Sequence, residues 1–499
     1  MASLAIYEFL PKKLCLSRNL TPQNHTIKSH LSPSSIRFFS TSPRWNLRVS
    51  EFSSSDFNSL KVNQNRLMDT IHHTCQWGTG QRWGDTPTET GMKRLALTDS
   101  DKSARDWFVS ETQSLGCKTT IDAMGNIFAV RPGLNNDAPP TYAGSHLDTQ
   151  PSGGRYDGIL GIVAGLEMLR VLNENWVETE YPVGVVNWTN EEGARFPISM
   201  VSSAVWAHQI PLEQAHNLKE VGSGTATQKS ELQKIGYLGS TPAAHTSIPL
   251  SAHFELHIEQ GPILETSSSL IGIVTGVQAY KWFTITVTGK DTHTGTTPFA
   301  TRADAMLTAS KMILQSHRIA TKHGGLASTG ILNLEPGSTN TVPGIVRFSL
   351  DIRSGKDEVV EAMEKEVREV FAKIARGENV DGLNDGCTDG KPCIVDITTD
   401  SDSKAVKFHE DCIGCVRDAA GGLFGEKTEE LTRELASGAG HDSVNTSKVC
   451  PTSMIFVPSK DGVSHNPAEY TKPEDCATGA QVLLGAVLRY DRLRKDRGE

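Results

Sequence analysis

Strand-like and helix-like patterns of apolar residues alternate along the first half of the chain. Short apolar runs at 140–146, 182–188 and 253–261 predict buried strands, and the segment 158–176 has apolar residues at helical spacing. Strands that alternate with helices predict an α/β fold with a mostly parallel sheet that is covered on both faces. Ligands of such sheets bind at the carboxyl ends of the strands.

The middle of the chain has a different pattern, in which strictly alternating strands enclose two helical segments. The expected elements, in order, are a strand at 280–289, a helix at 302–317, a strand at 328–334, a strand at 344–353, a helix at 356–376 and a strand at 393–399. This βαββαβ order is that of a ferredoxin-like unit. We therefore predict an inserted domain over 278–400, between two parts of a catalytic domain at 51–277 and 401–499. The Gly/Asp-rich segment 377–393 is predicted to be a surface loop.

The first 50 residues differ from the rest of the chain. They contain seven Lys/Arg, one acidic residue (Glu8) and many Ser and Thr. Such a composition is typical of a mitochondrial transit peptide, so we predict import into the mitochondrial matrix, with cleavage shortly after Arg37. The alternative is a disordered tail on a cytoplasmic protein.

The composition narrows the class of protein. The chain is 37% hydrophobic and 21% charged, with a formal net charge of −9 and a pI near 6.0, which argues against nucleic-acid binding. Apolar runs stay well below the ~20 residues that cross a bilayer, so no membrane partner is expected. Nine cysteines spread over the whole length do not indicate a disulfide scaffold. Cys412 and Cys415 form one CxxC, which could be half of a zinc site but is predicted to be a pair of structural thiols.

Two segments, GSHLDTQPSGGRYDG and NWTNEEGARF, contain the residues with the clearest chemistry. The first contains His146 and Asp157, and the second contains Glu191 and Glu192. A histidine, a carboxylate that can bridge two ions and a pair of acids are what a two-metal hydrolytic site requires. Such a site polarises a carbonyl, lowers the pKa of water and needs a nearby base.

Each of these residues also has a plainer interpretation. His146 could be a core histidine, but Asp148 two positions later favours a ligand, because ligating histidines usually donate their other N–H to a carboxylate. Glu191 and Glu192 could be a solvated loop pair, yet they follow an apolar strand, where neighbouring side chains point in different directions. His257 could also be packed core, although the ligand interpretation is favoured.

Seven motifs in order resemble the amidase/hydantoinase/carbamoylase branch of the M20 metallopeptidase-like family. They are GSHLDTQPSGGRYDG, NWTNEEGARFPISM, ELHIEQGP, HTGTTP, LDIR, GAGHDS and SHNPAEY. The resemblance extends from about Arg66 to the C-terminus. Within the branch it is greatest to the group of fungal β-alanine synthases (β-ureidopropionases) and N-carbamoyl-L-amino acid hydrolases.

The resemblance implies a role for each matching residue. It implies two zinc ions per subunit, with Mn²⁺, Co²⁺ or Ni²⁺ as alternatives, bound by His146, Asp157, Glu192, His257 and His465, of which Asp157 bridges the ions. Glu191 matches the general base, and Asp148 matches a carboxylate that orients a ligand. The implied substrate contacts are Gln260, His293, Asn340, Arg353 and His441. His293 would also stabilise an oxyanion, and it and Asn340 would reach the site from the lid of a partner subunit in a homodimer.

The resemblance further implies hydrolysis of the carbamoyl group of an N-carbamoyl amino acid. N-Carbamoyl-β-alanine is the favoured substrate, with allantoate and N-carbamoyl-L-α-amino acids as close alternatives. Arg353 could bind the substrate carboxylate through two parallel hydrogen bonds, although a strand arginine could also simply face solvent. A peptidase or aminoacylase is a more remote alternative, and a non-catalytic metal-binding protein is disfavoured because none of the family's residues is lost.

Overall fold

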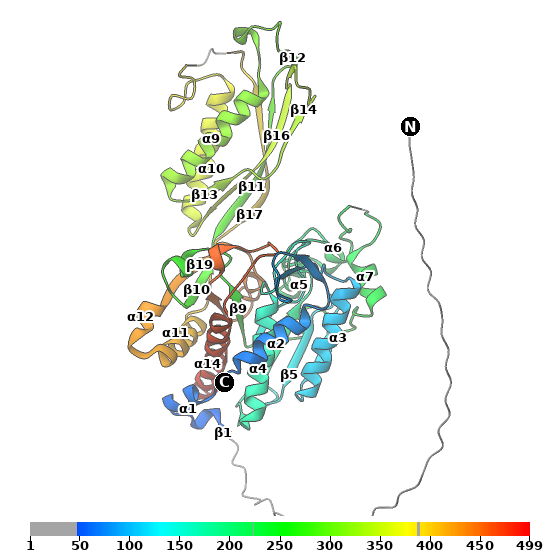
Figure 1. Ribbon diagram of the computed structural model, residues 1–499, viewed down its shortest axis with the longest axis vertical. Coiled ribbons are helices and arrows are strands. Elements are labelled where there is room, and N and C mark those ends of the chain that lie inside the picture. The colour runs from blue at the N-terminus through cyan, green and yellow to red at the C-terminus, as the bar shows by residue number, and fades with distance from the viewer. Residues whose placement is uncertain (1–46, 223, 387–389) are drawn as a thin grey trace, which may run out of the picture. The chain divides into compact units, whose positions relative to one another are not determined.

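The computed structural model describes residues 47–222, 224–386 and 390–499 (Figure 1). Residues 1–46, and with them most of the predicted transit peptide, lie outside the described residues, so the mitochondrial address stays a prediction. Strand β1 (Leu47–Arg48) pairs in parallel with β7 (Val177–Glu178), and Val49 is buried. The folded chain therefore includes residues just before the boundary that we predicted at 50.

The larger sheet has nine strands among the described residues, and its four central strands run parallel. The strand order is β18-β10-β20-β9-β6-β8-β5-β4, with β19 beside β10. The strands are β4 Lys118–Ile121, β5 Ile127–Arg131, β6 Thr141–His146, β8 Val183–Trp188, β9 Ala252–Ile258, β10 Ile271–Val277, β18 Val406–Lys407, β19 Thr432–Ser437 and β20 Thr452–Val457. The predicted parallel sheet is confirmed for β20, β9, β6 and β8. The outer neighbours β10 and β5 pair antiparallel with β20 and β8, which the apolar pattern did not indicate.

Both faces of this sheet are covered. One face packs against α4 (Ile159–Glu174), α11 (Glu410–Phe424) and α14 (Pro473–Arg497), with α3 (Asp99–Ser114) over β4 and β5 and α2 (Gln64–Thr74) against α4 and α14. The other face carries a smaller apolar cluster that includes Tyr142, Val186 and Trp206, the last of which lies in α5 (Val201–Trp206). Alternate residues of β6 and β8 thus enter different cores, which explains why every residue of both strands is buried.

The smaller sheet has the predicted ferredoxin-like order and its own apolar core. Its strands run β13-β16-β11-β17, with β14 also on β16, and all pairs are antiparallel. Figure 1 shows α9 and α10 side by side on this sheet, where they enclose Phe283, Phe348 and Met363. The elements are β11 Ala279–Thr288, α9 Ala305–His323, β13 Leu326–Ser328, β14 Leu332–Glu335, β16 Ile345–Ser354, α10 Asp357–Ala375 and β17 Ile394–Ser403. Because β17 runs to Ser403, the boundary predicted at 400 falls inside a strand.

Cys412 and Cys415 are buried thiols of α11, in agreement with a structural role, and all seven cysteines that the structure describes are free. Among the described helices, none combines the length and the apolar character that a membrane crossing requires.

Candidate metal centre and substrate pocket

The predicted ligands gather at the carboxyl ends of the parallel strands. His146 is the last residue of β6, and His257 lies near the end of β9. Asp157 ends the loop that leads into α4, and Glu192 follows β8, whereas His465 lies in the loop between β20 and α14. Loops from four adjacent parallel strands therefore meet at one edge of the sheet.

Asp157 stands at the centre of this group, and each of its two oxygens faces a different set of ligands. Asp157 Oδ1 lies 3.6 Å from Nε2 of His146 and 3.1 Å from Nε2 of His257. Asp157 Oδ2 lies 3.4 Å from Nε2 of His465, which is also 3.4 Å from Glu192 Oε2. Two triads result, His146–Asp157–His257 and Asp157–Glu192–His465, with the ligand atoms of each within 4.8 Å of one another. A carboxylate that belongs to both triads has the geometry of a bridging ligand.

Backbone carbonyls fix the imidazoles of the first triad. Nδ1 of His146 donates to the carbonyl oxygen of Asp148, and Nδ1 of His257 donates to that of Ile258, both at 2.9 Å. Each ring therefore presents Nε2 to the site. Nε2 of His146 is buried and has no hydrogen-bond partner among the described residues, as expected of a nitrogen that would bind a metal ion.

Asp148 contacts the predicted ligand Glu192 through its carboxylate, but it contacts His146 differently from the prediction. Its carbonyl, and not its carboxylate, orients His146, because the chain turns after β6 and sends the side chain toward the next loop. There the two carboxylate oxygens accept hydrogen bonds from the backbone N–H groups of Glu191 and Glu192, each at 3.3 Å. Asp148 thus holds the loop that carries the predicted base.

Gly158 allows the close approach of Asp157 to the histidines. Its φ is +67°, and a Cβ at this position would lie 2.3 Å from Cε1 of His146. Any side chain here would displace the ring, which accounts for a glycine directly after the bridging carboxylate.

The site contains a group of buried carboxyl groups that no lysine or arginine of the described residues pairs with. Seven acidic residues are buried or nearly so, and no lysine or arginine of the described chain forms an ion pair with them: Asp148, Asp157, Glu191, Glu192, Glu255, Asp442 and Glu469. Burial raises the pKa of Glu192 and of Glu469 to about 7. Burial also raises the pKa of Glu191 well above its usual range. A donor set of this charge and geometry fits divalent cations.

The pKa values of two histidines of the site are shifted in opposite directions. The hydrogen bond with Asp157 raises the pKa of His465 to about 9. Burial, together with the neighbouring His257, lowers the pKa of His441 well below its usual value. The ring of His441 lies 4.5 Å from that of His257, and its Nε2 lies 3.1 Å from the Ser437 hydroxyl. His441 is therefore a buried imidazole in the wall of the site.

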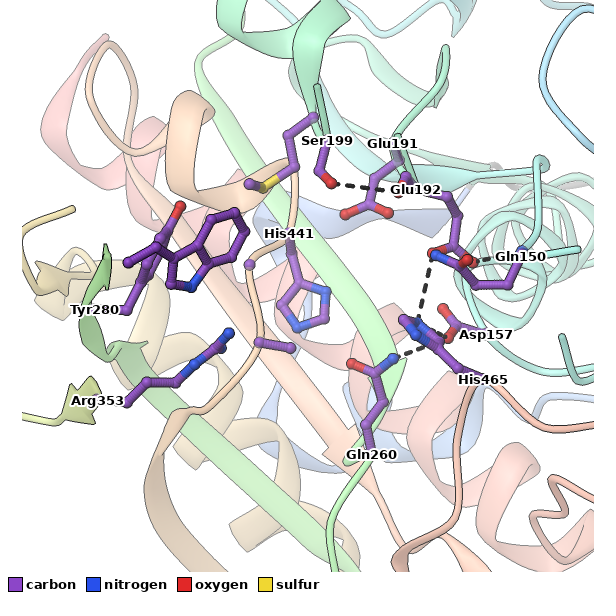
Figure 2. Close-up of a pocket in the computed structure, with 14 residues that line it drawn as sticks. Gln150, Asp157, Glu191, Glu192, Ser199, Gln260, Tyr280, Arg353, His441 and His465 are labelled. Carbon is purple, nitrogen blue, oxygen red and sulfur yellow. Dashed lines mark hydrogen bonds and ion pairs between the residues drawn. The ribbon is translucent and has the colours of Figure 1, made fainter. Parts of the chain in front are cut away.

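A pocket of about 300 Å³ opens onto these ligands. Figure 2 shows Asp157, Glu192 and His465 on one side of it, Arg353 and Tyr280 on the other, and His441 between them. Tyr280, Trp282 and Arg353 belong to strands of the smaller sheet. The pocket therefore combines a carboxylate-rich end with an end that holds an arginine and two neighbouring, tilted aromatic rings.

Three of the predicted substrate contacts line this pocket, namely Gln260, Arg353 and His441. Gln260 Nε2 donates to Asp157 Oδ2 at 2.8 Å, so this side chain also supports the bridging carboxylate. The Arg353 guanidinium is paired with Asp351 at 2.8 Å and donates to the Gly438 carbonyl at 2.8 Å. Both contacts hold Arg353 at the pocket wall.

The other two predicted contacts lie together but outside this pocket. His293 is in β12 (Thr292–His293), which pairs with β15 (Thr341–Val342), and the Thr294 N–H donates to the Asn340 carbonyl at 2.9 Å. Both side chains are exposed, and neither is among the residues that line the pocket. Within one chain, the structure thus joins His293 to Asn340 but not to the ligands.

Several residues of the site were not predicted from the sequence. Gln150 donates to Glu192 at 2.7 Å, and Ser464 and Glu469 contact the Asp157 loop. Ser464 and Glu469 flank His465 in the SHNPAEY motif, so position in the motif was an available signal. For Tyr280 and Trp282, the sequence indicated an alternating strand but no role in the site.

Residues 142–489 match the model of Peptidase family M20/M25/M40. An N-carbamoyl-L-amino-acid amidohydrolase of Rhizobium meliloti is 37% identical over 430 residues, which are 86% of this chain and 96% of that protein. An allantoate amidohydrolase of Bacillus subtilis is 28% identical and covers 85% of this chain and 97% of its own length.

A solved structure shows the same fold. The amidase of the hydantoinase/carbamoylase family from Burkholderia multivorans aligns with a TM-score of 0.76 and 42% identity, over 87% of this chain and 99% of that one. The alignment therefore extends over most of this chain and nearly all of the solved one.

Proposed function

The chain belongs to Peptidase family M20/M25/M40, and from this premise we propose that it is a two-metal amidohydrolase that cleaves the ureido C–N bond of N-carbamoyl amino acids. The observation that carries the proposal is the pair of triads that share Asp157, beside a pocket with an arginine at its far end. The names of the relatives support the carbamoyl group as the target.

Each part of the site has a chemical role in this reaction. Two divalent ions, which we propose to be zinc with Mn²⁺, Co²⁺ or Ni²⁺ as alternatives, would polarise the ureido carbonyl and acidify water. Glu191 takes a proton from the attacking water and returns it to the nitrogen that leaves. The overall reaction converts the ureido acid and one water to the free amino acid, CO2 and NH3.

The arginine end of the pocket suits a substrate that carries a carboxylate. The Arg353 guanidinium is planar and can form two parallel hydrogen bonds with a carboxylate. Asp351 already occupies one side of it, so a substrate would use the remaining donors. N-Carbamoyl-β-alanine is our favoured substrate, and allantoate and N-carbamoyl-L-α-amino acids are the alternatives.

We expect ammonia release from N-carbamoyl-β-alanine, and the amide analogue of this substrate should react much more slowly, because it cannot pair with Arg353. The measurement compares kcat/KM over a panel of N-carbamoyl-β-alanine, its amide, allantoate, N-carbamoyl-L-α-amino acids and dipeptides. The metal content is determined on the same sample. Cleavage of dipeptides alone would contradict the proposal, and equal rates for acid and amide would remove Arg353 from carboxylate binding.

We also propose that two copies form a dimer through the smaller sheet. The outer edge of this sheet, at β13 and β14, has exposed Leu326, Leu332 and Leu334, and α9 beside it exposes Leu307 and Leu314. An apolar strand edge of this kind needs a cover. Two-fold pairing of β14 with a second β14 would bury it symmetrically.

The dimer would also complete the site. The Gly295 N–H donates to Nδ1 of His293 at 3.0 Å, which leaves Nε2 as the protonated nitrogen and hence a donor for a developing oxyanion. Because His293 and Asn340 lie outside the pocket of their own chain, we propose that they serve the pocket of the second copy.

A mixed dimer tests this arrangement. Glu191→Gln and His293→Ala homodimers should each be nearly inactive, whereas co-expression should restore activity, because one of the two sites in the mixed dimer contains neither substitution. The two forms carry different affinity tags, so that the mixed dimer can be isolated before the assay. A mixed dimer as inactive as its parents would show that His293 does not act across the interface.

A further inference from the structure

We propose that Glu469 is a positioning residue that joins the two loops bearing Asp157 and His465, and that the ion on the His465 side depends on it. This inference rests on the two-ion site proposed above. Glu469 is 2% exposed and forms no ion pair with a lysine or arginine among the described residues. A buried carboxylate of this kind must be satisfied by hydrogen bonds, and those of Glu469 lead to the bridging ligand.

One oxygen of Glu469 holds the loop before Asp157. The backbone N–H groups of Tyr156 and Asp157 donate to Glu469 Oε1 at 3.0 and 3.1 Å. The fit is close, because a Cβ on Gly154 would lie 2.1 Å from this same oxygen. Glu469 therefore fixes the main chain at the bridging residue itself.

The other oxygen reaches the Asp157 side chain through Ser464. The Ser464 hydroxyl lies 2.9 Å from Glu469 Oε2 and 3.0 Å from Asp157 Oδ2. Asp157 Oδ2 is the oxygen that faces His465, the residue next to Ser464. His465 has a φ of +52°. Residues other than glycine rarely adopt this backbone conformation, and they do so where contacts with their surroundings hold them. Loss of Glu469 would therefore disturb the His465 triad more than the His146 triad.

Two substitutions at Glu469 separate its hydrogen bonds from its charge. In Glu469→Gln the amide oxygen can still accept from both backbone N–H groups, and the amide nitrogen can donate to Ser464 Oγ, which leaves the Ser464 proton available to Asp157. Glu469→Ala removes all three contacts. We expect Glu469→Gln to bind metal nearly as the wild type does, and Glu469→Ala to bind one ion normally and the other about 10–100-fold more weakly, the usual effect of losing a partner of a ligand.

Asp491→Ala is the matched control. Asp491 is 1% exposed and also accepts hydrogen bonds from two consecutive backbone N–H groups, those of Glu180 and Tyr181, both at 2.9 Å. These precede β8, at the amino end of the strand, away from the site. Asp491→Ala should lower the melting temperature while leaving the affinity for both ions unchanged.

The experiment titrates metal-free protein with Zn²⁺ and measures the stoichiometry and the two dissociation constants. Wild-type affinity for both ions in Glu469→Ala would overturn the inference, as would an equal loss in Asp491→Ala. If Glu469→Ala does not fold, Ser464→Ala takes its place: a weakened second ion supports the inference and unchanged binding overturns it. Fewer than two ions in the wild type would instead refute the proposed two-ion site, and the inference with it.

Discussion

Replacing Glu191 by glutamine is expected to lower turnover by about 10²–10⁴-fold while both ions stay bound, the usual loss when a positioned base is removed. Glu191 is 6% exposed, lines the pocket and is held through its backbone N–H by Asp148. Burial raises the pKa of its carboxyl group well above the usual range. Glutamine keeps the shape but cannot accept the proton.

The neighbouring acid provides the control for this result. Glu192 Oε2 faces His465 at 3.4 Å, so Glu192→Gln should lower the metal content as well as the activity. The measurement combines steady-state kinetics with metal analysis of each variant. If Glu191→Gln lost an ion, Glu191 would be a ligand, and if it kept its activity with both ions bound, the base would lie elsewhere.

Asp157→Ala is expected to lose both ions and to reduce activity to background. Its two oxygens face different triads, so no other single substitution should empty both. Because ligands that bind only the folded state stabilise it, added Zn²⁺ should raise the melting temperature of the wild type but not that of Asp157→Ala.

Two single-triad variants show whether this effect is specific to Asp157. His257→Ala and His465→Ala should each lose one ion and keep part of the Zn²⁺-dependent stabilisation. Two ions still bound to Asp157→Ala, by metal analysis after dialysis, would contradict the bridging role.

Strong periodic segments of the fold could be predicted from the sequence. The central strand predicted at 182–188 is β8, Val183–Trp188, and the alternating run at 344–353 is β16, Ile345–Ser354. Both patterns are clear for a physical reason. A strand that is buried on both faces requires a continuous apolar run, whereas a strand that is buried on one face requires alternating apolar and polar residues. The strand β4 was not predicted, since it is short, lies at the margin of the sheet and contains a single apolar residue. The inner strand β10 was also not predicted, although most of its residues are apolar and buried.

The site was predictable where chemistry limits the residue type. His146, Asp157 and His465 stand where the ligands were expected because few other side chains bind divalent ions. The contacts that orient them were less predictable. The carbonyl of Asp148 replaces its carboxylate as the partner of His146, and a backbone acceptor leaves no trace in the sequence. Glu469 lies more than 300 positions from Asp157, and only folding brings the two together.

The position of β20 determines when the site can form during synthesis. This strand, Thr452–Val457, is made from the last tenth of the chain, yet it lies inside the sheet between β9 and β10. Until β20 has left the ribosome, the backbone N–H and C=O groups of β9 and β10 on the sides that will face it can pair with other strands. His465 follows it, so a growing chain could complete one triad early but not the other. Loading of the second ion would then require that β20 and the loop of His465 have been made and have joined the sheet.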